Sequence, residues 1–271
     1  MRPKIWKGFA LVLGIGVPLF MLDAFARSAL YPAPSVPVPS PPPPSLEEVR
    51  LDLSTGETVV GWARAAPSLP PDAPVVLFFH GNGENLQTMN WAGMFEDLEQ
   101  LGVAYLAVDY PGYGRSSGKP SEEGLMATGD AAVAWARRQH SGRPVVLCGW
   151  SLGAATVIPT AARHPEDVRG LIALSPWTSL KDVASHHFPA FLVKALLRER
   201  YDSLEAARRI RVPALVIHGD LDDLIPAAQG KLVAEALAGP KKWVSLPGAG
   251  HNDLFARPEV WREIEAFLRS I

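Results

Sequence analysis

The chain has 271 residues, 48% of them hydrophobic, and a formal net charge of -2 at pH 7. This length and composition are sufficient for one large globular domain with a buried core. The small net charge, with no long basic run beyond the N-terminus, argues against nucleic acid as a partner. The single cysteine, Cys148, cannot form an internal disulfide, and its apolar neighbours indicate a buried, unreactive thiol.

The N-terminal segment carries a membrane signal. Basic residues come first, and residues 8–22 are apolar, glycine or proline until Asp23 follows them. One interpretation is a signal peptide cleaved after residues 24–26, which would release a secreted or periplasmic protein. We favour a retained single-pass anchor within residues 1–27, because the run is long for a signal and Arg27 is a poor neighbour for cleavage. Both interpretations place the remaining chain outside the cytoplasm.

A proline-rich linker is expected at residues 28–45. Proline has no amide donor for a β-ladder, so the tract at 32–44 favours polyproline II. As a stiff spacer, that tract would hold the folded domain on the order of 40 Å from its anchor. We expect the domain itself to span residues 46–271.

The first half of the domain reads as strands and helices in alternation. Residues 47–65 predict a β-hairpin of edge strands, and apolar runs at 75–79 and 103–108 predict strands buried on both faces. Helical spacing predicts one helix over 85–101 and another over 121–140, with Ser121 as its N-cap.

The second half continues the alternation and contains one long insertion. Strands are expected at 145–148, before the turn at 149–153, and at 168–174, 212–218 and 243–246, with helices after Ser151 and at 226–237 and 258–271. Pro159 should kink the helix after Ser151 or end it early. Residues 176–209 are too long for a simple crossover, so we expect a small cap, which either forms a wall for an acyl chain or only packs on the sheet. The pattern predicts an α/β fold: a mostly parallel sheet of about eight strands with helices on both faces and sites at the strands' carboxyl ends.

The nucleophile motif is Gly149-Trp150-Ser151-Leu152-Gly153, which lies between a buried strand and a run of small residues. A sharp turn there would lift the Ser151 hydroxyl clear of the sheet, and the two glycines would let strand and helix pass closely. A pattern of five residues can also occur by chance, but the strand before it, the small residues after it and the partner residues described next argue against a chance match.

A serine nucleophile needs a base and an acid that orients the base. His251 follows the last strand in a loop of small residues, so we assign it as the general base. Asp220, Asp222 and Asp223 all follow the preceding strand, and the residue pattern does not choose among them. Two backbone amides would hold the oxyanion: that of Leu152, directly after the nucleophile, and one after Phe79, for which we select Asn82.

Seven motifs together resemble a known family. They are residues 80–83 (HGNG), 109–114 (DYPGYG), 149–153 (GWSLG), 175–180 (SPWTSL), 200–203 (RYDS), 218–222 (HGDLD) and 250–253 (GHND). Together they resemble the serine α/β-hydrolases with a short lid and an N-terminal membrane segment, a branch related to eukaryotic protein depalmitoylases and serine aminopeptidase-like hydrolases. The resemblance covers residues 46–271 and implies the α/β-hydrolase fold.

This resemblance implies an acyl-enzyme mechanism on esters or thioesters. It selects Asp222 as the acid, four residues after His218, and implies structural roles for His218 and His80. The chain departs from the lipid-processing members because it has no N-terminal cysteine cluster, so their substrate is not carried over.

Two other functions compete with the serine hydrolase. A peptidase would need an acidic pocket for the substrate amine, for which Glu84 and Asp253 are weak candidates; a binding protein with this fold would need no triad. We expect a small-molecule or acylated substrate, a monomer and no cofactor, since the glycine-rich loop at 109–116 lacks the dinucleotide-binding order. We expect no metal either, because His186 and His187 are adjacent and have no acidic or thiol partner at ligand spacing.

Overall fold

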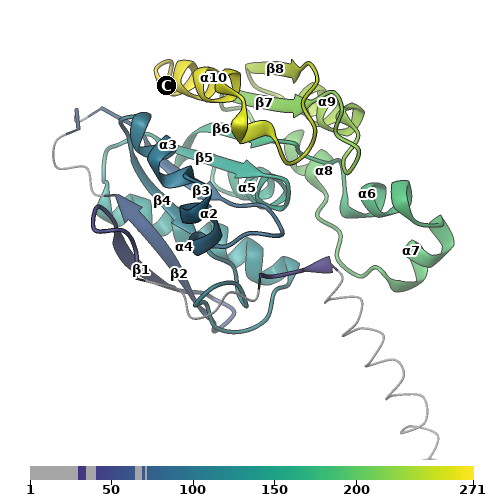
Figure 1. The fold of residues 1–271 in the computed structure, drawn as a ribbon, viewed down its shortest axis with the longest axis horizontal. Helices are drawn as coiled ribbons and strands as arrows, with labels where there is room; N and C mark the ends of the chain where they lie inside the picture. The colour runs from purple at the N-terminus through teal and green to yellow at the C-terminus, as the bar shows by residue number, and fades with distance from the viewer. Residues whose placement is uncertain (1–29, 35–40, 65–68, 71) are drawn as a thin grey trace, which may run out of the picture.

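The computed structural model describes residues 30–34, 41–64, 69–70 and 72–271. Eight strands form one sheet in the order β1-β2-β4-β3-β5-β6-β7-β8 (Figure 1). The strands are β1 Glu47–Asp52, β2 Thr58–Arg64, β3 Val75–Phe79, β4 Ala104–Val108, β5 Val145–Trp150, β6 Val168–Leu174, β7 Ala214–Gly219 and β8 Lys241–Leu246. Only the β1/β2 and β2/β4 pairs are antiparallel, so the predicted mostly parallel sheet is confirmed.

Helices cover both faces of the sheet because its central strands are apolar on both sides. The helices are α2 Leu86–Trp91, α3 Met94–Gln100, α4 Glu122–Gln139, α5 Leu152–Arg163, α6 Leu180–His187, α7 Ala190–Leu196, α8 Ser203–Ala207, α9 Ala227–Ala236 and α10 Pro258–Leu268, with a 3-10 turn at Leu254–Ala256. Along β3, Leu77 packs with α4 and α5, whereas Phe78 packs with α2, α3 and α10. This alternation creates two hydrophobic cores, one on each face.

Three predicted elements differ from the structure. The single helix expected at 85–101 is wrong: it is divided into α2 and α3 by Gly93, whose left-handed backbone (φ 78°) ends the first helix. Of the two effects expected at Pro159, a kink or an early end, the early end does not occur, since α5 continues to Arg163. Of the hairpin strands, only β1 lies at the edge; β2 is buried along most of its length and pairs with β4.

The chain around Tyr31 packs on the domain, although it lies at the start of the expected linker. Tyr31 is only 5% exposed, and its hydroxyl lies 2.6 Å from the Tyr201 hydroxyl and donates to Glu199. Leu30 and Ala33 are partly buried against the same core. The start of the expected linker, at residues 30–33, therefore packs on the domain.

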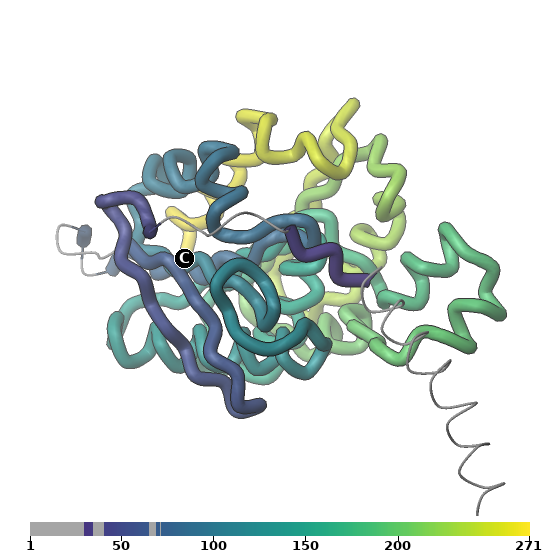
Figure 2. The backbone as a smooth tube through the Cα atoms, turned by 60° about the horizontal axis from the view of Figure 1, so that its bottom comes forward, coloured from purple at the N-terminus to yellow at the C-terminus, as the bar shows by residue number. Residues whose placement is uncertain are grey.

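The cap expected at 176–209 contains α6, α7 and α8. Figures 1 and 2 both show α6 and α7 standing out from the body of the molecule. Within the described residues, no helix is both long and apolar enough to cross a membrane; the apolar run at 8–22, with the predicted anchor, lies outside them.

We expect Tyr31→Ala to lower the free energy of unfolding of the full chain by about 3 kcal/mol, because it removes a buried aromatic ring from the core. Denaturant unfolding in detergent would measure the loss. Leu232→Ala is the control, since Leu232 is half exposed on α9 and its truncation should cost little. Equal stabilities for the Tyr31 variant and the wild type would mean that this segment does not stabilise the fold.

Candidate active site

The predicted strand, turn and helix around Ser151 are present. Ser151 links β5 to α5 with φ 56° and ψ -112°, a backbone conformation that L-residues rarely adopt. Its amide donates to Leu174 O at 2.9 Å, which fixes the turn to the neighbouring strand β6. A Cβ atom at Gly149 would collide with the Gly153 carbonyl, and one at Gly153 would collide with the Phe79 carbonyl. Both positions require glycine, because the start of α5 passes directly over β3 and β5.

Ser151, His251 and Asp222 form a hydrogen-bonded chain. His251 Nε2 lies 3.0 Å from Ser151 Oγ, and His251 Nδ1 lies 2.7 Å from Asp222 Oδ2. The three side chains come from the turn after β5, the loop after β8 and the loop after β7. All three residues are largely buried, at 5% to 6% exposed. Ser151 and His251 are about 100 residues apart in the sequence. They meet because the parallel strands that precede their loops all end at the same edge of the sheet.

The structure also distinguishes the three candidate aspartates. Asp222 alone reaches His251, whereas Asp220 accepts a 2.7 Å hydrogen bond from the Gly248 amide and so supports the loop that carries the histidine. Asp223 is exposed to solvent.

Asp222 is surrounded by hydrogen-bond donors. Its Oδ1 accepts from the Leu224 and Ile225 amides, and its Oδ2 lies 2.7 Å from His251 and 3.1 Å from His218 Nε2. Burial alone would raise the pKa of this carboxyl, but the bonds from His218 and His251 outweigh burial and hold the pKa well below its usual range. The carboxylate stays charged and can stabilise a positive imidazolium on His251.

His218 contacts the acid directly, which the sequence interpretation of a structural histidine did not foresee. Its Nε2 lies 2.8 Å from Ile225 O as well as 3.1 Å from Asp222 Oδ2, so that nitrogen carries the hydrogen and shares it between the two oxygens. The signal in the sequence was the four-residue spacing of His218 and Asp222 directly after a strand.

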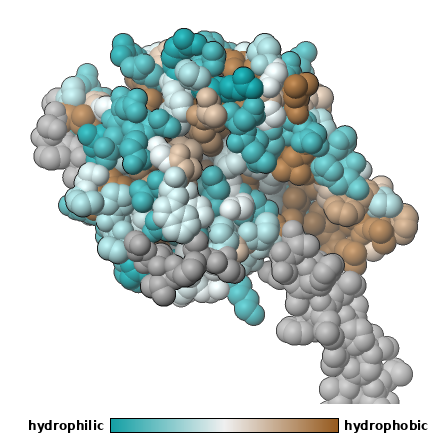
Figure 3. Space-filling model, in the orientation of Figure 1, coloured by the Kyte–Doolittle hydropathy of each residue, from teal (hydrophilic) through white to brown (hydrophobic). Residues whose placement is uncertain are grey.

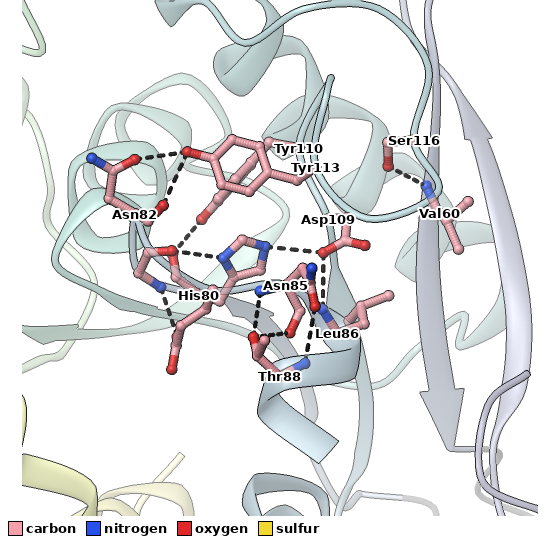
Figure 4. A network of polar contacts seen from close by, with 12 residues as sticks. Val60, His80, Asn82, Asn85, Leu86, Thr88, Asp109, Tyr110, Tyr113 and Ser116 are labelled. Carbon is pink, nitrogen blue, oxygen red and sulfur yellow. Dashed lines mark hydrogen bonds and ion pairs between the residues drawn. The ribbon is translucent and has the colours of Figure 1, made fainter. Parts of the chain in front are cut away.

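The loop that carries Asn82 is held by bonds to its carbonyl groups (Figure 4). Tyr110 donates to His80 O, and the Tyr113 hydroxyl donates to the Asn82 side chain and contacts its carbonyl. The side-chain amide nitrogen of Asn82, Nδ2, also donates to Leu30 O at 2.6 Å, which links this loop to the N-terminal segment. The loop thus has a fixed backbone beside the nucleophile turn, as a pre-organised oxyanion site requires.

A buried ion pair supports the same loop. His80 Nδ1 lies 2.8 Å from Gly81 O and Nε2 lies 3.2 Å from Asp109 Oδ1, so both nitrogens face acceptors, as in an imidazolium. Burial would lower the pKa of His80, but Asp109 outweighs it and the pKa is raised. A Cβ atom at Gly114 would collide with the Asp109 carboxylate, so the glycine-rich turn at 109–116 leaves room for this pair.

Comparisons with known proteins agree with this geometry. Residues 74–198 match the family described as alpha/beta hydrolase fold. An uncharacterised protein of Mycobacterium tuberculosis is 35% identical over 241 residues, which cover 88% of this chain and 84% of that protein. The chain belongs to the α/β-hydrolase family.

Two further similarities involve named proteins. Human alpha/beta hydrolase domain-containing protein 17B is 33% identical over 197 residues, or 71% of this chain and 65% of that protein. The solved structure of the Pyrococcus furiosus esterase Pf2001 has a TM-score of 0.70 at 19% identity, covering 88% of this chain and 98% of that one. The second similarity concerns the fold alone.

Other candidate residues of this α/β-hydrolase are already engaged. The Glu84 carboxylate accepts from the Gly81 amide, and Asp253 pairs with Arg257 at 2.9 Å. One oxygen of each carboxylate is thus bonded within the protein, whereas Asp253 Oδ1 has no hydrogen-bond partner among the described residues. His187 Nε2 lies 2.8 Å from Leu224 O, and its ring packs edge-on against that of His186.

We expect Asp109→Asn to lower the free energy of unfolding by about 3 kcal/mol below pH ~6, because it leaves the charged His80 buried without its partner. Since the folded pKa of His80 is raised, the stabilisation is complete below the unfolded pKa and disappears as pH rises through the folded one. The difference in the free energy of unfolding between the wild type and the variant should therefore become smaller at alkaline pH. Denaturant unfolding at a series of pH values would measure it.

Asp130→Asn is the matched control, because Asp130 pairs with His164 at a half-exposed site. It should cost less than about 1 kcal/mol at any pH. If Asp109→Asn lowers the free energy of unfolding by the same amount at every pH, His80 is not charged in the folded protein.

Proposed function

We propose that this protein is a serine hydrolase that cleaves carboxylic esters or thioesters through an acyl-enzyme. The observation that carries the proposal is the continuous hydrogen-bonded path from Ser151 Oγ through His251 to Asp222. The hydroxyl at its end is held on a strained turn at the carboxyl edge of the sheet, where the α/β-hydrolase fold places its nucleophile.

The first half-reaction forms the acyl-enzyme. Ser151 Oγ attacks the carbonyl carbon of the substrate while His251 Nε2 takes its proton, and the carbonyl oxygen becomes an oxyanion. We propose that the backbone amides of Leu152 and Asn82 donate to that oxyanion. When the tetrahedral intermediate collapses, the bond to the leaving alcohol or thiol breaks and His251 returns the proton to it.

The second half-reaction regenerates the enzyme. A water molecule gives one proton to His251 while its oxygen attacks the acyl carbon, and the carboxylic acid departs as the proton returns to Ser151 Oγ. In both halves the charged Asp222 stabilises the imidazolium and holds the Nδ1 hydrogen of His251 in place. Its low pKa keeps it ionised throughout, so it is not protonated during turnover.

We further propose that residues 1–27 anchor the protein in a membrane with the catalytic domain outside the cytoplasm. The apolar run at 8–22 behind a basic start supports this placement. The similarity to alpha/beta hydrolase domain-containing protein 17B supports the class of reaction, but the missing N-terminal cysteine cluster leaves the substrate of this chain open.

Ser151→Ala should abolish labelling by a fluorophosphonate probe and reduce turnover of nitrophenyl esters at least about 10⁴-fold, because it removes the nucleophile. The full chain is the sample, since Tyr31 belongs to the fold. Ser175→Ala is the matched control: Ser175 is buried with φ 46°, and its hydroxyl has no partner in the described structure. A folded wild type that neither labels nor turns over any ester from acetyl to palmitoyl would refute the proposal.

Asp222→Asn should lower kcat by about 10⁴-fold while the protein remains folded, because an amide cannot accept from all the donors around it and misorients His251. Steady-state kinetics of Asp220→Asn, Asp222→Asn and Asp223→Asn would compare the three candidates. Asp223→Asn should leave kcat unchanged, since Asp223 is exposed. A similar loss in the Asp222 and Asp223 variants would contradict our assignment of the acid.

A further inference from the structure

The cap carries a cluster of exposed apolar side chains. Phe188, Phe191, Leu192 and Leu196 are 62%, 71%, 41% and 40% exposed, and we call these four residues the cap face. Figure 3 shows hydrophobic residues gathered over α6 and α7, beside an otherwise largely polar surface. Large exposed apolar clusters on a protein surface mark sites that bind a protein, a membrane or a ligand.

The cap face is connected to the loop of the catalytic acid. His187, next to Phe188, bonds to Leu224 O at 2.8 Å. Leu224 and Leu221, on either side of Asp222, are themselves 45% and 66% exposed. Exposed apolar side chains are therefore present on both the cap and the loop that carries Asp222.

The N-terminal segment meets the domain beside this same cap. Tyr31 bonds to Glu199 and Tyr201, which follow α7 by only a few residues, and Leu30 bonds to Asn82 in the loop near the nucleophile. Residues 23–29 alone separate Leu30 from the apolar run at 8–22. Seven residues span at most about 25 Å even when fully extended, so a bilayer that holds the run lies close to the cap.

The charge around the cap face fits a lipid surface. Four basic side chains are exposed on this part of the chain, namely Lys181, Lys194, Arg198 and Arg200. Three acids lie on the same stretch: Asp182, which bonds to Thr178 and Ser179, Glu199, which accepts from Tyr31, and Asp202, which caps α8. Apolar side chains flanked by cations are the composition of a segment that lies in the interface of a bilayer with anionic headgroups.

We propose that the cap face is a membrane-docking surface, which inserts into the same bilayer as residues 8–22 and turns the active site towards it. The acyl groups available to the enzyme would then be those of the membrane or of proteins and lipids at its surface. Docking itself does not require hydrolysis; the assignment of membrane acyl groups as substrates rests on the proposed function.

The test compares two exposed aromatic positions in the full chain. Phe191→Cys and, as the matched control, Trp91→Cys (Trp91 is 65% exposed on α2) are made in a Cys148→Ala background and labelled with the environment-sensitive dye NBD. Each protein is placed in nanodiscs of phosphatidylethanolamine and phosphatidylglycerol, with and without brominated acyl chains. We expect a blue shift and several-fold stronger quenching at position 191 than at position 91. Equal quenching at the two positions would overturn the proposal.

A double variant separates docking from chemistry. Phe191→Ser with Leu192→Ser should lower turnover of a long-chain ester in nanodiscs by about tenfold or more, because two inserted apolar side chains are lost, and leave turnover of a short soluble ester unchanged. Equal losses on both esters would contradict a docking role. If the wild type hydrolyses neither ester, the proposed function fails, and the quenching result still decides the docking.

Discussion

The close passage of α5 over strands β3 and β5 is the constraint on which the active site depends. Gly149 and Gly153 leave no room for a Cβ atom, so the turn between them is compressed and Ser151 takes a positive φ. Such a conformation costs on the order of 1–3 kcal/mol in a non-glycine residue and persists only where the surroundings impose it. Here β5 is paired on both sides, with β3 and β6, and the Ser151 amide is bonded to β6. The fold thus stabilises a turn that would not form in isolation.

Two buried carboxylates organise the polar groups around this turn. Asp222 collects donors from His218, His251 and its own loop, and Asp109 holds His80 and the Leu86 amide. Each lies in a loop directly after a strand, β7 for the first and β4 for the second. Because an unpaired buried charge is costly, each carboxylate fixes the loops that supply its partners. One thereby orients the base, and the other supports the loop on which Asn82 lies.

The N-terminal segment contacts both the cap and one of the loops at the active site. Tyr31 reaches the residues that follow α7, and Leu30 reaches Asn82, so the entering chain contacts both the cap and the loop beside the nucleophile. Leu30 and Tyr31 therefore meet the domain on the side where the loop of Asn82 and the cap lie. This arrangement is the physical basis of our proposal that the cap face and the apolar run at 8–22 contact the same bilayer.

The sequence by itself determined the elements that depend on local patterns. Apolar runs located the buried strands, Ser121 located a helix cap that the structure confirms, and Ser151 with its two glycines predicted the nucleophile turn. The position of His251 after the last strand also followed from the pattern, because parallel strands end at one edge. Gly93 was missed because helical spacing continues across it, and a single left-handed residue is enough to divide the helix.

Only the tertiary structure decided the contacts between distant segments. Residue pattern alone left Asp220, Asp222 and Asp223 as equal candidates, since all three follow the same strand; the distance to His251 separates them. Tyr31 is buried against Tyr201, which lies 170 residues away in the sequence. The residue pattern around Tyr31 does not predict that contact. Local patterns encode which face of an element is buried, whereas the pairing of loops is fixed only when the sheet brings their strands together.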